Sequence, residues 1–137
     1  MSAVATYEAV KVYLEANWTD TPLVFENDKS QLPAQAAAFV YVEVFGNSFS
    51  QESIGDPGHN VWRERGQIML HVMTKRASGS REARVIADSL AALFREIGPE
   101  GFDITEMSLG AGEPGEGDGN YWRYSLVIPF ERDDIPA

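Results

Sequence analysis

Two dense apolar runs dominate the pattern of hydrophobic and polar positions along the chain. Residues 39–45, Phe-Val-Tyr-Val-Glu-Val-Phe, and residues 68–73, Ile-Met-Leu-His-Val-Met, are rich in β-branched, aromatic and long apolar side chains, which is typical of strands. A polar connection from Gly46 to about Asn60 follows the first run, and residues 61–67 lead into the second. We predict one long hairpin whose arms form the sheet centre and whose tip projects. A connection this long is more often functional than a plain turn.

Apolar residues at helical spacing predict two helices, over residues 3–16 and 81–97, with Gly98 and Pro99 ending the second. Their apolar stripes are Ala3, Tyr7, Val10, Leu14 and Trp18 in the first helix, and Val85, Ile86, Leu90, Leu93, Phe94 and Ile97 in the second. The other predicted elements are strands over 23–25, 102–109 and 121–130 and a glycine-rich acidic loop over 110–120. The predicted fold is therefore α+β, a two-layer domain with the order α-β-β-β-α-β-β. Its sheet is mixed and mostly antiparallel, and residues 1–137 form a single domain.

The two central strands have no fully polar face. Val40, Val42 and Val44 share one face of the first strand, and the opposite face alternates aromatic residues with Glu43. A sheet open to water on one side would show a clean polar face. Two arrangements are consistent with this pattern. The helices cover both faces, or both helices cover one face and a neighbouring subunit covers part of the other.

Composition and charge exclude several classes of protein. The chain has no cysteine, which excludes disulfides, thiol catalysis and cysteine zinc sites. Its net charge of −10 argues against nucleic-acid binding through a basic surface. No apolar run is long enough for a membrane span, and the N-terminus does not resemble a signal peptide, so we expect folding in the cytoplasm and no membrane partner.

The charge is also uneven along the chain. Seven of the eleven basic residues lie between positions 63 and 95, whereas residues 96–118 contain seven acids and no base. This separation can steer self-association, although a solvated surface with chance clustering accounts for it equally well.

The candidate motifs for cofactor or metal binding are weak. Gly110-Ala-Gly-Glu-Pro-Gly115 matches the dinucleotide fingerprint, but a strand follows it where the fingerprint needs a helix, and its acids would repel phosphate. The same loop lacks the spacing of a calcium-binding EF-hand loop. We therefore expect no cofactor and no metal.

The catalytic candidates are equally few. The two histidines, His59 and His71, have no recognisable nucleophile and orienting residue in their local sequence, so we expect His71 to be structural and the protein not to be an enzyme. Phe49 and Ile54 are different, because they are apolar residues in a polar projecting segment. They either bury against a partner or fold back on the domain.

Several segments resemble the small tail proteins of long-tailed phages and gene transfer agents. They are Glu15-Ala-Asn-Trp18, Thr21-Pro-Leu-Val-Phe-Glu-Asn27, Phe39-Val-Tyr-Val-Glu-Val44, Gln51-Glu-Ser-Ile-Gly55, Arg65-Gly-Gln-Ile68 and the helix 83–94. The resemblance covers about residues 4–95, and the acidic loop 110–120 has no counterpart in it. It implies a tail terminator similar in fold to the lambda tail terminator, acting as a hexameric ring without enzyme activity.

This resemblance implies a virion protein that caps the tail tube, ends its growth and provides the surface that joins the head. The implied partners are other copies in a homo-hexamer, the major tail tube protein and a head-tail connector or stopper protein, with DNA passing through the ring without specific binding. The candidate interface residues are Phe45, Phe49, Gln51, Ile54, Trp62, Arg63 and Arg65. The alternatives are another ring of the neck or tube and, from a different class, a small-molecule-binding or hydrolytic α+β domain.

Overall fold

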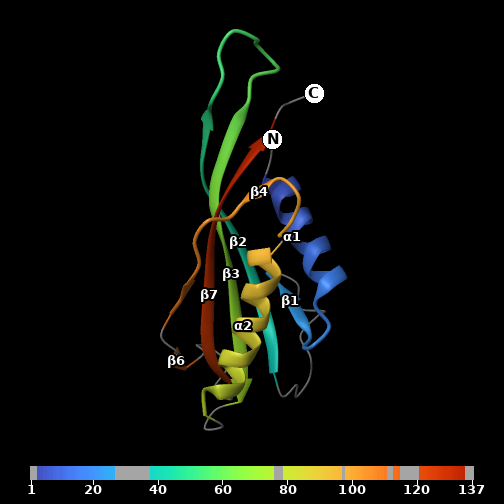
Figure 1. Ribbon diagram of the computed structural model, residues 1–137, viewed down its shortest axis with the longest axis vertical. Helices are drawn as coiled ribbons and strands as arrows, with labels where there is room; N and C mark the ends of the chain where they lie inside the picture. The colour runs from blue at the N-terminus through green and yellow to red at the C-terminus, as the bar shows by residue number, and fades with distance from the viewer. Residues whose placement is uncertain are drawn as a thin grey trace.

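The computed structural model has the predicted α+β class, with two helices and a mixed, mostly antiparallel sheet (Figure 1). It describes residues 3–26, 38–75, 79–96, 98–110, 113–114 and 121–134. Helix α1 spans Ala3–Asn17 and helix α2 spans Arg81–Glu96, each within a residue of the predicted bounds. No helix in these ranges is long and apolar enough to cross a membrane.

The sheet is built around three 14-residue strands: β2 (Ala38–Gln51), β3 (Trp62–Lys75) and β7 (Tyr121–Asp134). They pair in the order β2-β3-β7, and both pairings are antiparallel. Strand β1 (Leu23–Phe25) adds to β2 in parallel at one edge. At the other edge the short strands β4 (Phe102–Asp103), β5 (Ser108–Leu109) and β6 (Glu113–Pro114) pair with successive parts of β7.

Both helices pack on the same face of the sheet, so the arrangement with a helix on each face is wrong. Coverage of the other face by a neighbouring subunit stays a prediction. The main core joins Val10 and Leu14 of α1, Leu90 of α2, and the inward residues of the sheet such as Leu70 and Leu126. Each of these five side chains is fully buried. The stripe predicted for α2 is wrong at Val85, which is 47% exposed because it lies on the outer side of the helix. Ile97 lies outside the described residues.

The helix-free face of the sheet carries a second, smaller apolar cluster. Val24, Phe39, Met73 and Tyr121 are buried there, with Tyr41 packed beside them. Phe39 and Tyr121 meet edge to face with ring centroids 5.0 Å apart. The cluster lies at the end of the sheet far from the hairpin tip. Its buried apolar side chains explain why the central strands lack a clean polar face.

The hairpin is longer in its strands and shorter in its connection than predicted. We expected a polar connection from Gly46 to about Asn60, but β2 continues to Gln51 and β3 begins at Trp62. Strand β7 also continues past the predicted end at Phe130 and pairs with β3 as far as the Trp62–Asp134 position. The projecting part is therefore a three-stranded stalk, residues 46–51, 62–66 and 130–134, and residues 52–61 form its tip (Figure 1).

The single strand predicted over residues 102–109 is wrong, since the chain leaves β7 between β4 and β5. Asp103 pairs with Glu131 and Ser108 pairs with Val127, so four residues, 104–107, stand opposite three, 128–130. The extra residue interrupts the ladder, as in a bulge. Within the interruption, Ile104 and Met107 turn toward the main core and pack against it.

The stalk leaves the sheet at a close contact between β2 and β3. The pairing register of these strands shifts between Gly46 and Ser48, where β2 has one extra residue. At Gly66 a side-chain Cβ would lie 2.1 Å from the backbone oxygen of Phe45 and 3.0 Å from the ring of Phe130. Only glycine fits at this position, which accounts for the Arg65-Gly-Gln segment at the stalk base.

Candidate assembly interface

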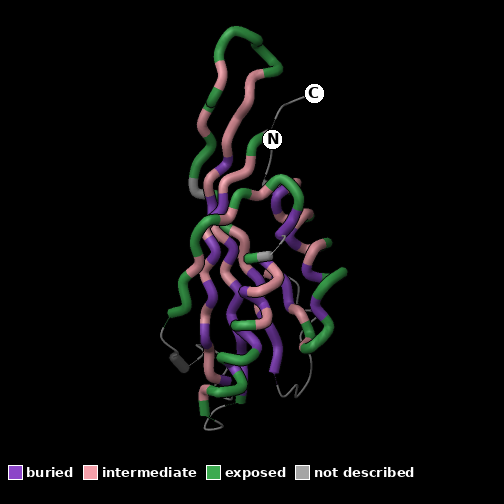
Figure 2. Tube along the Cα trace, viewed as in Figure 1, coloured by how far each residue is buried: buried purple, intermediate pink, exposed green. Residues whose placement is uncertain are grey.

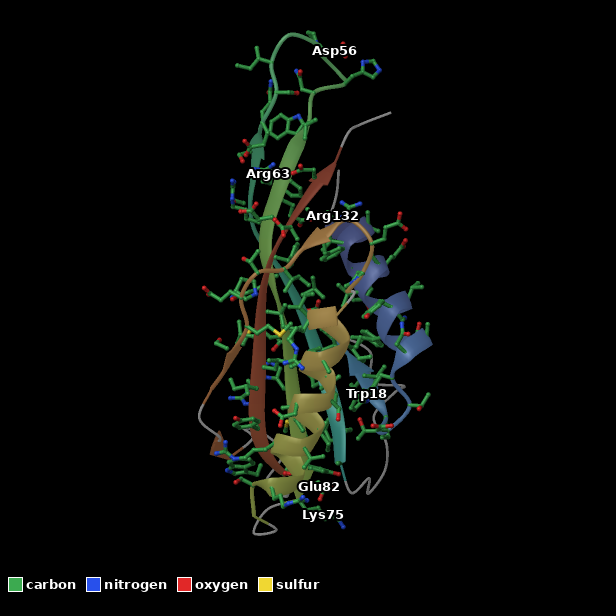
Figure 3. All side chains as sticks on the ribbon, viewed as in Figure 1. Trp18, Asp56, Arg63, Lys75, Glu82 and Arg132 are labelled. Atoms are coloured by element: carbon green, nitrogen blue, oxygen red, sulfur yellow. The ribbon has the colours of Figure 1, made fainter. Side chains whose placement is uncertain are left out.

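One side of the stalk, on the helix-free face, is a ladder of charged side chains. Arg63 binds the carboxylate of Asp133 through two hydrogen bonds of 2.7 and 3.2 Å (Figure 3 shows Arg63 on the stalk). Arg65 donates to Glu131 at 3.2 Å and to the hydroxyl of Ser50 at 2.9 Å. The Arg63 hydrogen bond lowers the pKa of Asp133 below its usual value, and the same contact raises the pKa of Arg63. These pairs join β7 to β3 in the part of the sheet that no helix covers.

The other side of the stalk is apolar near the tip and polar at the base. Phe49 and Trp62 lie on the helix side of the strands, and Phe49 is 38% exposed. Nearer the body, Glu64 is fully buried, and the hydroxyl of Thr6 in α1 donates a hydrogen bond to its carboxylate. Because α1 belongs to the body and Glu64 to the stalk, this contact fixes the direction in which the stalk leaves the body.

The tip is held by its own hydrogen bonds. The backbone N–H of Val61 donates to the hydroxyl of Ser53 at 2.8 Å, and the backbone N–H of Asp56 donates to the side-chain oxygen of Asn60 at 3.2 Å. Glu52 N–H donates to the carbonyl of Val61 at 2.7 Å and continues the ladder by one step. Figure 2 shows that the end of the hairpin is exposed along its trace. On this ordered loop the side chain of Ile54 is 93% exposed.

The structure divides the seven predicted interface residues among three surfaces. Alternation along β2 and β3 puts Phe49, Gln51 and Trp62 on the helix side of the stalk. Phe45, Arg63 and Arg65 share the helix-free face, where Phe45 is 38% exposed, and Ile54 stands alone at the tip. They do not form one patch. Of the two readings of Phe49 and Ile54, folding back on the domain does not describe Ile54, whose side chain contacts solvent.

A polar cluster on the helix-free face was missed from the sequence. The ring of His71 lies between Ser125, 2.7 Å from Nδ1, and Glu43, 2.5 Å from Nε2. The three residues come from β7, β3 and β2. The signal that could have found the cluster is the alternation of the strands, which places Glu43 and His71 on the same face. Ser125 required the pairing of β7 with β3, which local sequence does not contain.

This cluster has the residue types of a nucleophile, base and orienting acid, but its surroundings do not suit catalysis. His71 is only 5% exposed, and it lies in the middle of the three-stranded ladder. A buried polar cluster that fixes the register of β2, β3 and β7 accounts for the geometry.

A groove runs beside α2 on the helix-bearing side of the sheet. It lies between α2 and the interrupted segment 104–109 and has a volume of about 590 Å³. Ala91 and Leu126 form its buried floor, and Leu109 on its wall is 45% exposed. No polar group that is unpaired and fully buried points into it among the described lining residues. The groove thus combines an apolar floor and wall with the charged side chains of Asp88, Arg95 and Glu106.

The histidine, aspartate and glutamate side chains of the described ranges form no group of three that could hold a metal ion. The acidic loop 110–120, where the nucleotide and calcium motifs were weighed, lies mostly outside those ranges. The fold and these surfaces define a class of protein: a small α+β domain with a projecting three-stranded arm.

Comparison with known proteins identifies the family within this class. The family model described as phage tail terminator protein matches residues 5–130, and the chain belongs to this family. It is a family of structural proteins, so the chain is a virion component with a structural role in the phage tail, in contact with other tail and head components.

Among solved structures, one whose description names no function is 21% identical, with a TM-score of 0.58. The match covers 98% of this chain and 94% of the other, and it shows that the fold is shared. No curated protein matches the chain.

Proposed function

We propose that the protein forms a homo-hexameric ring that caps the tail tube, ends its growth and presents the surface that joins the head. The observation that carries this proposal is the ordered, exposed tip of the hairpin on a three-stranded stalk. An isoleucine that is 93% exposed on a hydrogen-bonded loop gains nothing for the fold of one subunit. It is suited to burial against a partner, as interface anchors are.

The division of the candidate residues between two sides of the stalk supports a ring over a two-fold dimer. A closed ring needs two different, complementary surfaces on each subunit. Phe49, Gln51 and Trp62 provide one such surface, and Phe45, Arg63 and Arg65 on the opposite face provide the other. In this proposal residues 1–137 act as a single domain.

The proposed partners follow from this position in the particle. The ring would stack on the major tail tube protein on one side and on a connector or stopper protein on the other. A net charge of −10 is consistent with DNA passing through without being held, since an acidic lumen repels phosphates. Assembly would take place in the bacterial host cytoplasm, and the mature site is the tail end nearest the head.

The experiment is native mass spectrometry of the purified protein, alone and with tail tubes, together with complementation of a phage that lacks this gene. We expect hexamers, at high concentration or on tubes, and restored infectious particles. A strict monomer that also fails to bind tubes would contradict the ring. Hexamers that bind a different neck component and leave tube length unregulated would favour the alternative, another ring of the neck.

A hydrolytic α+β domain is the second candidate, and the Glu43–His71–Ser125 geometry is the observation in its favour. His71→Gln separates the two. Glutamine retains hydrogen bonding without a basic ring, so a structural His71 predicts a modest stability loss and normal tail completion. A general base at this position predicts a rate loss of roughly two to four orders of magnitude and, if the activity is needed, loss of particles from a folded, ring-forming variant.

A further inference from the structure

We propose that Ile54 at the hairpin tip of one subunit inserts into the groove between α2 and residues 104–109 of the neighbouring copy. This inference rests on the proposed ring and names the contact that links its subunits. It assigns the tip to a second copy of this chain and not to the tail tube.

The tip has the properties of a preformed anchor. Its loop is closed by the Ser53–Val61 and Asp56–Asn60 hydrogen bonds, so little backbone freedom is lost on binding. Gly55 and Gly58 have positive φ angles of 107° and 88°, which turn the chain sharply on either side of Asp56. Ile54 thereby stands on the outside of the turn with its side chain almost fully exposed.

The apolar part of the groove lining suits an isoleucine side chain. Its walls carry Ile104, Met107 and Leu109, and the first two are half-buried against the main core. A volume of about 590 Å³ is large enough for an isoleucine together with the backbone of the turn that carries it. Leu109, 45% exposed, is the most exposed apolar side chain of the wall and the direct counterpart for Ile54.

One pair of opposite charges is available to this contact. The chain is strongly acidic, so most approaches bring like charges together. The first residue of the tip, Glu52, already lies 3.5 Å from Arg65 of the stalk. Asp56 remains exposed at the turn, and Arg95 lines the groove and is exposed on α2. A docked tip brings this carboxylate toward that guanidinium only if it stays clear of Asp88 and Glu106, which also line the groove.

The contact is heterologous, because tip and groove are different surfaces of one chain. They are also far apart along the long axis of the subunit, so one chain cannot make the contact with itself (Figure 1). Repeating such a contact gives a closed ring when the rotation per step is a whole fraction of a turn. It also requires the long axis of each subunit to incline along the ring circumference, so that the arm reaches over its neighbour.

The absence of cysteine makes a disulfide test direct. Ile54→Cys combined with Leu109→Cys places one thiol on the tip and one in the groove, at exposed positions where the fold tolerates the change. We expect mild oxidation under ring-forming conditions to give covalent dimers through hexamers on a non-reducing gel. Ile54→Cys alone should give dimers at most. Matched controls are Ile54→Cys with Val85→Cys on the outer side of α2, and Leu109→Cys with Val12→Cys on α1.

A ladder from the Val85 or Val12 control, with none from the Ile54–Leu109 pair, would overturn the inference and place a different surface in the groove. Hexamers in native mass spectra without any Ile54–Leu109 cross-link would overturn it too, and leave the proposed ring intact. Capture of the tail tube protein by a photo-reactive residue at position 54 would also overturn the inference and leave the proposed ring intact. A wild-type chain that forms no ring and binds no tube would overturn both proposals. As a second readout, Ile54→Asp should weaken assembly about tenfold or more.

Discussion

The body and the stalk are made by the same three strands, yet they differ in almost every physical property. In the body, Ile68, Leu70 and Val72 of β3 point into an apolar core under two helices. In the stalk, the same face of β3 carries Trp62 and the buried Glu64, and no described helix lies over Phe49 near the tip. Burial of apolar surface therefore stabilises the body, whereas the stalk relies on strand pairing and ion pairs. The stalk is consequently free to present side chains to partners.

A cavity in the body should have the largest effect on stability. Leu70 is fully buried beneath both helices, and Leu70→Ala should lower the free energy of unfolding by about 2–5 kcal/mol. Chemical denaturation followed by circular dichroism measures this change. Leu109→Ala, on an exposed wall of the groove, is the matched control and should change little. An equal decrease in the free energy of unfolding of the two variants would mean that burial in the main core does not dominate the stability.

A side chain at the junction between body and stalk should be nearly as damaging. Gly66→Ala places a methyl group against the backbone oxygen of Phe45, and the strands must separate to admit it. We expect the free energy of unfolding to fall by about 3 kcal/mol, the upper end of the range typical of overpacking. Gly110→Ala is the control, since the nearest atom to its Cβ would be 3.8 Å away. A wild-type melting temperature for Gly66→Ala would show that β2 and β3 are not so close here.

The contact that aligns the stalk with α1 should matter less. Thr6→Val keeps the shape of the side chain but removes the hydroxyl that donates to the buried Glu64 carboxylate. The expected loss of unfolding free energy is about 1–2 kcal/mol, because the acceptor is left without this partner. The exposed Thr105→Val provides the comparison. If the two variants unfold identically, Glu64 is satisfied without Thr6.

The charged ladder should have the smallest effect, and that effect should depend on pH. Hydrogen bonding to Arg63 lowers the pKa of Asp133, so the contribution of this pair is present above the unfolded-state pKa of about 3.9. It is lost as the pH falls through the lower folded-state value. The protection factors of the stalk amides, which are corrected for intrinsic exchange, should fall slightly there, and less so in high salt, because the pair is partly exposed. An Asp133→Asn variant should show no such fall in protection of the stalk amides with pH.

The difference between body and stalk also explains which elements can be predicted from the sequence alone. Apolar runs and alternation predicted the body parts of β2, β3 and β7, and apolar residues at helical spacing predicted both helices, because burial imposes these patterns. The stalk strands were not predicted, since Gly46, Ser48 and the Arg63-Glu-Arg65 segment have neither an apolar run nor high strand propensity. The β3 part of the stalk pairs with β7, a partner more than sixty residues away, and the β2 part pairs with β3.

Part of that information was nevertheless present in the sequence. Arg63 and Arg65 alternate, as do Glu131 and Asp133, and opposite charges at matching spacing on two strands indicate a paired face. Phe49 and Ile54 stood out in the sequence as apolar residues in a polar segment, and the structure shows both side chains exposed, whereas their role at an interface stays a prediction. The groove was not anticipated, because it depends on the one-residue excess between β4 and β5, which only the pairing register defines.

The most direct test of the separation between body and stalk is one double variant measured twice. Phe49→Ser with Ile54→Ser removes the exposed apolar side chains of the stalk and tip and leaves the core untouched. The account predicts a change of less than about 1 kcal/mol in the free energy of unfolding of the monomer, because neither side chain belongs to the main core: Ile54 is 93% exposed and Phe49 is 38% exposed. It also predicts that hexamers disappear from native mass spectra and that complementation for infectious particles fails. A strongly destabilised monomer, or a stable variant that still assembles and completes tails, would contradict it.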